Sequence, residues 1–182
     1  MSKRPSKIER ADLHVAHKAA TVRDSLPVRV AGTLSELADQ PQLYSICWAV
    51  IAFGVFMRRR QVARTGMRML AAEWLATKAK SAIKHRIDRT RPAVPVEGGT
   101  YRMERGRSKD KPLNSFPSGH TAGAVAVARA YASEHPEHAM PAYAAAALVA
   151  LVQIPRCKHY PTDIAAGAAI GLVAGSLVAR VD

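Results

Sequence analysis

The stretch IAAGAAIGLVAGSLVA, residues 164–179, has no charged side chain and carries glycine at every fourth position from 167 to 175. Residues four apart share one face of an α-helix, so Gly167, Gly171 and Gly175 form a flat stripe that admits another backbone closely. In a water-soluble helix, each interior glycine would cost roughly 1 kcal/mol relative to alanine. The stretch therefore favours a helix that packs against other helices within a membrane.

Two further segments, residues 40–57 and 139–155, also lack charge. The first ends against the basic residues 58–60, a pattern typical of a membrane helix anchored at the lipid headgroups. The second is short by about a turn for a full span. Residues 66–84 and 118–133 are helical in pattern but carry charges, and for the short spans a buried helix of a soluble bundle is the alternative.

Because no segment alternates apolar and polar residues over a useful length, we predict an all-α fold. It is an integral-membrane helical bundle of about five core helices over residues 41–182, preceded by a polar, amphipathic segment over residues 1–40. Within that segment, TLSE at residues 33–36 fits a capping box, which predicts a short helix beginning there and ending before Pro41. Residues 85–117 form the one long connection.

The 182 residues carry a formal net charge of +13, which indicates an anionic partner. The basic residues gather at motifs and helix ends without interleaved aromatic residues, so we expect no nucleic-acid partner. No Cys/His cluster has zinc spacing, and neither His14 with His17 nor His135 with His138 is expected to bind an ion. We therefore predict no metal and no cofactor; the oligomeric state stays open.

The helix ending near residue 84 carries Glu73, Lys80 and Lys84 on one face. For Glu73 and Lys80, a stripe facing solvent or lipid headgroups is as good an interpretation as a functional one. Lys84 differs, because Arg91-Pro92 follows at a distance that lets both cations point into one pocket. A guanidinium binds phosphate through two hydrogen bonds, and an ammonium acts as a point charge.

Pro117-Ser118-Gly119-His120 opens the next predicted helix. Ser118 is a suitable N-cap, and Gly119 lets a ligand approach the backbone closely. The free N–H groups and the dipole at a helix N-terminus favour an anion there. Taken alone, the motif is as well explained by a plain helix cap with an incidental histidine.

The last motif contains His159 and Asp163, with Pro161 in the first turn of the final helix. This spacing lets the carboxylate accept a hydrogen bond from one imidazole nitrogen and leaves the other unprotonated, as a nucleophile or base. Such a pair is often structural. Here Arg156 and Lys158 add positive charge at the same helix entrance, which favours function.

Three motifs follow one another along the chain: Lys84-x6-Arg91-Pro92, Pro117-Ser118-Gly119-His120 and His159-x3-Asp163. In this order, they resemble the three signature motifs of the type 2 phosphatidic acid phosphatase (PAP2) superfamily. This superfamily includes bacterial lipid phosphatases, glucose-6-phosphatase-type enzymes and vanadium haloperoxidases. The resemblance covers roughly residues 66–180. It implies a small, metal-independent membrane phosphatase that hydrolyses a lipid phosphate monoester or diphosphate.

The resemblance also implies roles for the motif residues. His159 attacks phosphorus and forms a phosphohistidine, Asp163 orients it, and His120 protonates the leaving oxygen. The groups expected to hold the phosphate oxygens are Lys84, Arg91, Ser118 and the Gly119 amide. Water then releases phosphate from His159.

The third motif departs from the family pattern, because Gln153 stands where the family has an arginine six residues before the histidine. Either Arg156 supplies the missing guanidinium, or the pocket lacks one cation. The loss of such a contact costs about 2–3 kcal/mol, roughly a hundredfold in rate. We predict an active enzyme, with a catalytically impaired phospholipid-binding membrane protein as one alternative. A vanadate-dependent haloperoxidase is another, disfavoured by the hydrophobic spans.

A membrane-embedded site with a basic rim suits an amphiphile whose phosphate lies at headgroup level, with prenyl diphosphates first and phosphatidate-type lipids next. The small, alanine-rich chain suggests a multi-pass protein of a bacterial inner membrane. The basic residues 58–60 and Arg64 favour a cytoplasmic loop, which places the motifs on the outer face.

Overall fold

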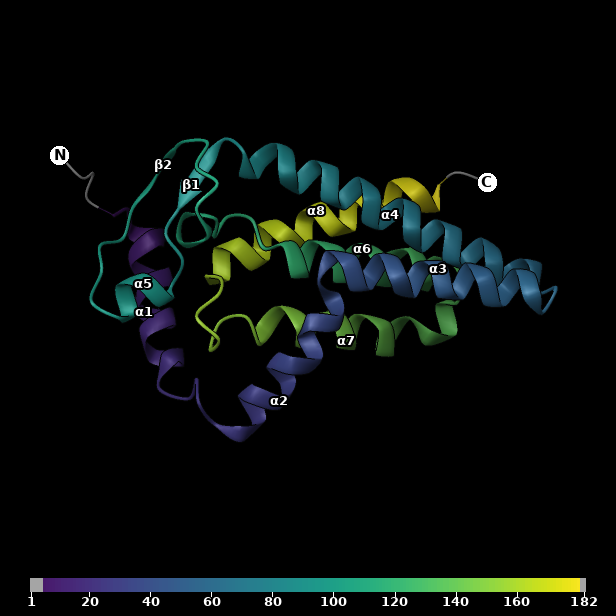
Figure 1. The fold of residues 1–182 in the computed structure, drawn as a ribbon, viewed down its shortest axis with the longest axis horizontal. Coiled ribbons are helices and arrows are strands. Elements are labelled where there is room, and N and C mark those ends of the chain that lie inside the picture. Colours follow the sequence, from purple (N-terminus) through teal and green to yellow (C-terminus); the bar gives the residue numbers. More distant parts are fainter. Residues whose placement is uncertain (1–4, 181–182) are drawn as a thin grey trace.

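The computed structural model describes residues 5–180. Residues 1–4 of the predicted N-terminal segment and residues 181–182 of the predicted bundle lie outside the described residues. Figure 1 shows long helices side by side along the molecule, with β1 (Ile87–Arg89), β2 (Met103–Arg105) and α5 (Ala93–Val96) together at one end. The helices are α1 (Lys7–Ala20), α2 (Leu26–Ser35), α3 (Gln40–Phe56), α4 (Arg60–Lys84), α5 (Ala93–Val96), α6 (Gly119–Glu134), α7 (Ala139–Leu151) and α8 (Pro161–Ala179). Three 3-10 turns, η1 (Glu36–Ala38), η2 (Lys111–Leu113) and η3 (Pro136–His138), lie between them.

The prediction of a helical bundle is confirmed. Helix α6 is central in it and packs against α4, α7 and α8, while α3 packs against α4 as a hairpin. The long connection holds a small sheet that the sequence did not reveal, in which β1 (Ile87–Arg89) pairs antiparallel with β2 (Met103–Arg105). Strands of three residues are too short to show an alternating pattern.

The glycine stripe of α8 packs against α6, as predicted. A Cβ built at Gly167 would lie 2.6 Å from the Ser118 carbonyl oxygen, and one at Gly171 would lie 2.5 Å from that of Ala122. At Gly175 the nearest atom, the Cβ of Arg129, is 2.7 Å away. Only glycine permits this approach, which brings the starts of α6 and α8 together.

The predicted helix start at residues 33–36 is wrong. Helix α2 begins at Leu26, with Pro27 in its first turn, where the missing N–H of proline costs nothing. Thr33 lies inside α2, and its hydroxyl donates to the Arg29 carbonyl oxygen 3.1 Å away instead of capping. The capping residue for the next long helix is Asp39, whose carboxylate accepts from the Gln40 N–H.

The N-terminal segment is attached to the bundle by α1. Ser6 and Glu9 form a capping box at its start, and the helix buries Asp12 and Ala16. This N-terminal helix, which carries none of the motifs, therefore contributes a buried carboxylate at the end of the bundle where the motifs lie.

Within residues 5–180, α8 alone has both the length and the apolar composition of a membrane span. Helix α3 is apolar but has 17 residues.

Candidate active site

The three motifs meet where α4 ends and where α6 and α8 begin (Figure 1). Lys84 is the last residue of α4, Ser118 is the N-cap of α6, and Asp163 lies in the first turn of α8. The Ser118 N–H donates to the Asp163 carbonyl oxygen at 3.0 Å, which ties the two helix starts together. The structure thus brings together motifs that are far apart in the sequence.

His159 is buried, with 3% of its side chain exposed, and has one ring nitrogen fixed. Its Nδ1 lies 2.7 Å from the Ser115 carbonyl oxygen and 3.8 Å from Asp163 Oδ2. A carbonyl oxygen can only accept, so Nδ1 carries the proton and Nε2 of the neutral ring keeps its lone pair. The expected hydrogen-bond acceptor was Asp163; the structure puts the Ser115 carbonyl in that position, with Asp163 beside it.

The charge state of His159 follows from its surroundings. Burial lowers its pKa, and the positive charges of Lys84 and Arg91 act in the same direction, against the opposing effect of Asp163. The imidazole therefore stays neutral below the usual pKa of a histidine, which is the state that a nucleophile needs.

Asp163 is fully buried, and its carboxylate accepts hydrogen bonds from three groups. It accepts from the Ser115 hydroxyl at 2.6 Å, from the Tyr160 N–H at 2.9 Å and from Arg89 at 2.5 Å. Three donors hold the carboxylate ionised and fixed in orientation. The orientation of the negative charge next to His159 is thus set by Ser115, Tyr160 and Arg89, three residues to which the motifs assign no role.

Arg89 links that carboxylate to the N-terminal helix. It is 1% exposed, and its Nη2 donates to Asp12 Oδ2 at 2.7 Å while its Nη1 reaches Asp163. The Tyr160 ring stacks on its guanidinium, 4.3 Å from Cζ. Burial opposes the charge, but Asp163 and Asp12 outweigh it and raise the pKa of Arg89. The sequence analysis missed both Arg89 and Asp12, which are 77 residues apart.

Three cations at this end have no anion at ion-pair distance within residues 5–180. Within residues 5–180, the side chains of Lys80, Lys84 and Arg91 form no hydrogen bond or ion pair, and Arg91 Nε is buried. They lie close enough for their charges to interact. A Cβ at Gly119 would lie 3.0 Å from Lys80 Nζ, so this ammonium group lies over the start of α6. Such a group of unpaired cations at a helix N-terminus suits an anion.

Glu73, Lys80 and Lys84 form the charged stripe on α4, which the sequence allowed to face either solvent or a functional site. For Glu73, the prediction of solvent exposure is wrong. Its side chain is 1% exposed and accepts from the Thr77 hydroxyl at 3.0 Å, while Oε2 has no partner among the described residues. A Cβ at Gly123 of α6 would lie 2.6 Å from that oxygen. The stripe therefore faces α6 and the site.

His120 lies in the first turn of α6, close enough to His159 to interact electrostatically. Its Nε2 has no hydrogen-bond partner among the described residues but lies 3.7 Å from Glu36 Oε2 and 3.9 Å from Asp39 Oδ1. The oxygens of Glu36 and Asp39 and the His120 nitrogen lie within 4.8 Å of one another and are of the kind that can hold a metal. Sequence reasoning gave no sign of these two carboxylates.

Gln153 and Arg156 are both turned toward the η1 turn. Gln153 is fully buried and donates to Ser35 Oγ at 3.2 Å. Arg156 donates to the same hydroxyl at 2.8 Å and lies 2.5 Å from Glu36 Oε1, which Lys158 also contacts at 2.7 Å. Burial opposes ionisation of Glu36, but hydrogen bonds from Lys158 and Arg156 outweigh it and lower its pKa to about 2. The charge of Arg156 is therefore paired with a protein carboxylate.

Comparisons with known proteins agree on one family. The chain is 35% identical over 86 residues to a lipid A 1-phosphatase from Porphyromonas gingivalis; the match covers 45% of this chain and 19% of that protein. The match thus spans only about a fifth of the length of that relative. Its fold is similar to the first transmembrane PAP2 type phosphatidylglycerolphosphate phosphatase from Bacillus subtilis, with a TM-score of 0.67, 19% identity and coverage of 96% and 86% of the two chains.

The fold is also similar to LpxE from Aquifex aeolicus, with a TM-score of 0.66, 20% identity and coverage of 98% of each chain. These neighbours show the all-α bundle of the transmembrane PAP2 type. A family model matches residues 65–182, which include every recognised motif. The chain belongs to the PAP2 superfamily.

Proposed function

We propose that this protein is a metal-independent phosphatase of a membrane lipid, acting on a phosphate monoester or diphosphate through a phosphohistidine at His159. The observation that carries the proposal is the group of unpaired cations, Lys80, Lys84 and Arg91, beside a buried neutral imidazole. A phosphoryl group supplies the missing anion, and His159 Nε2 is the free nucleophile next to it.

The proposed reaction begins when the cations and the first N–H groups of α6 hold the phosphate oxygens. Ser118 Oγ accepts from the Thr121 N–H at 3.4 Å and the Thr121 hydroxyl at 2.9 Å, so its own proton is available for the phosphate. His159 Nε2 attacks phosphorus as the bond to the leaving oxygen breaks, and protonated His120 donates its proton to that oxygen. Water, deprotonated by His120, then attacks the phosphohistidine and releases phosphate.

Lys80 can replace the arginine that the family has at the position of Gln153. With Arg156 bound to Glu36, the pocket lacks the guanidinium that family members place at this point. Lys80 lies over the Gly119 backbone without a partner among residues 5–180, and we assign it the part of the third cation. This assignment favours an active enzyme over an impaired one.

The outer surface of the bundle supports a membrane location. Large apolar side chains are exposed on several core helices, including Trp48 and Phe53 on α3, Leu148 on α7 and Val173 on α8. Large apolar side chains exposed on three core helices suit contact with lipid. We therefore propose a multi-pass protein of a bacterial inner membrane. The basic residues 58–60 and Arg64 favour a cytoplasmic loop, and on that basis we propose a site on the outer face.

The nature of the relatives supports a lipid substrate. Their names specify lipid A and phosphatidylglycerolphosphate, both phosphorylated amphiphiles. For this chain we retain prenyl diphosphates and phosphatidate-type lipids as the substrate class, because a basic pocket in an apolar bundle requires only a phosphate on a hydrocarbon anchor.

Phosphate release tests the proposal. Purified protein in detergent is assayed with a prenyl diphosphate, phosphatidate and phosphatidylglycerol phosphate, with and without EDTA. We expect turnover of at least one lipid, unaffected by EDTA and abolished in His159→Ala, while the exposed His17→Ala serves as a matched control with wild-type activity. Turnover that survives in His159→Ala would contradict the mechanism. If Lys80 already supplies the third cation, Gln153→Arg leaves the rate within about threefold of wild type.

A further inference from the structure

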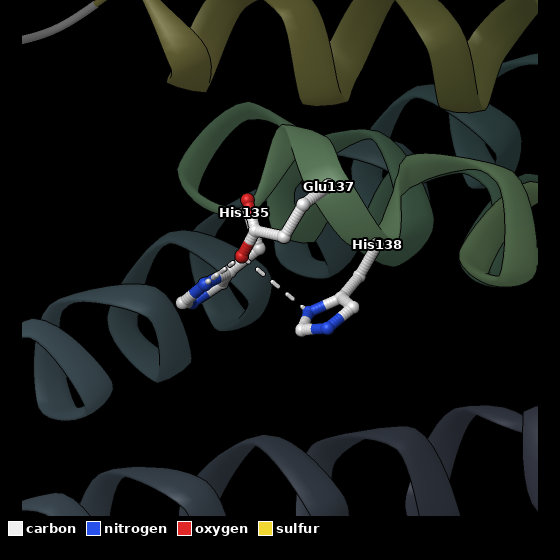
Figure 2. Close-up of side chains that lie close together, drawn as sticks. All are labelled: His135, Glu137 and His138. Carbon is white, nitrogen blue, oxygen red and sulfur yellow. Dashed lines mark ion pairs between the residues drawn. The ribbon is translucent and has the colours of Figure 1, made fainter.

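A second group of ligand-type side chains lies at the turn between α6 and α7 (Figure 2). This turn is at the opposite end of α6 from Ser118. His135 Nδ1 and His138 Nδ1 each lie 3.5 Å from the same oxygen of Glu137, Oε1. The three residues fall within four positions of the chain around η3, so one turn of chain brings all three ligand atoms close together.

A hydrogen bond to α4 orients the His135 ring. Thr65 donates its hydroxyl proton to the Gln61 carbonyl oxygen at 3.0 Å, and Thr65 Oγ1 lies 3.1 Å from His135 Nε2. Since its only proton is used, Thr65 accepts from Nε2–H. In neutral His135, Nδ1 then carries a lone pair and faces the Glu137 carboxylate. Two acceptors that face each other are stabilised by a cation between them.

Tyr131 restricts both rings. Its centroid lies 4.9 Å from that of His135, and 6.3 Å from that of His138 in a stacked arrangement. Its hydroxyl lies 3.3 Å from His138 Nδ1, and an ion bound at that nitrogen takes the place of this contact. The ligand geometry is therefore supported by packing as well as by the Thr65 hydrogen bond.

We propose that His135, Glu137 and His138 form a binding site for a divalent metal ion of the zinc class. Ligand atoms about 2.0–2.1 Å from a tetrahedral zinc ion are about 3.4 Å apart, close to the two separations of 3.5 Å. Two imidazoles and one carboxylate leave a fourth position for water. The His138 and Glu137 side chains are 58% and 61% exposed, so an ion reaches the site from solvent.

The neighbouring arginines do not pair with Glu137, so its carboxylate is available to a metal ion. Arg64 and Arg68 both pair with Glu134, so their charge is partly neutralised there. The ion pairs of Glu137 within the described residues are those with the two histidines. No metal was expected at His135 and His138 from the sequence; the carboxylate between them, Glu137, supplies the third ligand.

Metal titration tests the site independently of the phosphatase proposal. Protein purified without a histidine tag is titrated with Zn²⁺ by calorimetry in detergent, and with Co²⁺ by visible absorption. We expect one ion per chain, an affinity at least tenfold lower in His138→Ala and Glu137→Gln, and about tenfold lower in Thr65→Val, which removes the outer hydrogen bond. The exposed pair His14→Ala/His17→Ala is the matched control and keeps wild-type affinity.

Two results would overturn the proposal. One is Zn²⁺ binding by His135→Ala/His138→Ala that equals wild type. The other is loss of binding in Glu36→Gln instead of His138→Ala, which would place the ion at the Glu36, Asp39 and His120 cluster. Phosphate release is expected to be the same in His138→Ala and wild type, so absence of turnover in both would count only against the phosphatase proposal.

Discussion

Substitution of Asp12 by asparagine tests whether the N-terminal helix positions the nucleophile. Asp12 lies at the outer end of a chain of buried contacts that runs through Arg89 and Asp163 to His159. It touches none of the reacting atoms. We expect Asp12→Asn to lower kcat and leave KM nearly unchanged, because Asp163 loses part of its fixed orientation beside His159.

The magnitude follows from the contacts at the carboxylate. Asp12 Oδ2 accepts from Arg89 Nη2 at 2.7 Å and from the Thr162 hydroxyl, while Oδ1 accepts from the Thr162 N–H at 3.2 Å. With its oxygen at the Oδ2 position, asparagine keeps the contacts to Arg89 and the Thr162 hydroxyl but loses the negative charge that pairs with Arg89, and its NH₂ group faces the Thr162 N–H donor. A hydrogen bond to a charged group is worth about 1.5–3 kcal/mol. If about 2 kcal/mol of this reaches the transition state, kcat falls about 30-fold.

The assay is steady-state phosphate release in detergent, combined with thermal unfolding. Asp24→Asn, the same change at an exposed residue of the N-terminal segment, is the control and is expected to match wild type. A purely structural role would lower the melting temperature and the fraction of folded enzyme, with kcat per folded molecule intact. Wild-type kcat in folded Asp12→Asn would refute the positioning role.

Three further predictions concern other parts of the molecule. Lys80→Gln is expected to lower kcat/KM about tenfold or more through loss of a charged contact, whereas the exposed Lys78→Gln does not; equal effects would contradict the role of Lys80. The pKa of Glu36 is lowered from 4.5 to about 2, so its ion pairs stabilise the fold fully above pH 4.5. This stabilisation is lost as the pH falls toward 2 and the carboxylate is protonated. The melting-temperature difference between wild type and Glu36→Gln therefore shrinks between pH 5 and 3; a constant difference would be inconsistent with the ion pairs. Gly171→Ala puts a methyl group 2.5 Å from a backbone oxygen and is expected to destabilise by about 1–3 kcal/mol in thermal unfolding; unchanged stability would mean that α6 and α8 pack less closely.

The features that could be predicted from the sequence are those that depend on short spacing. The Ser118 cap needs only Thr121 three residues later, and the glycine stripe needs only the helical period. Helix α8 begins at Pro161 for the same local reason. These elements also carry the recognised motifs, so the location of the site followed from them.

The features that were missed depend on contacts between distant segments. Asp12 and Arg89 form an ion pair across 77 positions, and no local pattern links an N-terminal helix to a strand of the long loop. The Ser115 carbonyl beside His159 is a backbone group, which carries no signal in the side-chain sequence.

The placement of Arg156 shows the same limit. Its distance from His159 along the chain suggested a phosphate ligand, but the turn that holds it bends sharply at Cys157, which has a positive φ of 54°. Arg156, the residue before this bend, pairs its guanidinium with Glu36 of η1. A three-residue shift from the family position thus changed the partner of the side chain.

The central claim is that His159 is the nucleophile, and trapping of the phosphoenzyme tests it most directly. Enzyme is mixed with a ³²P-labelled lipid phosphate, quenched in alkali within milliseconds and analysed by peptide mapping. We predict an acid-labile, alkali-stable label on the peptide containing His159 in the wild type, and none in His159→Ala. Turnover of the lipid with no label on His159, or label that persists in His159→Ala, would contradict the account.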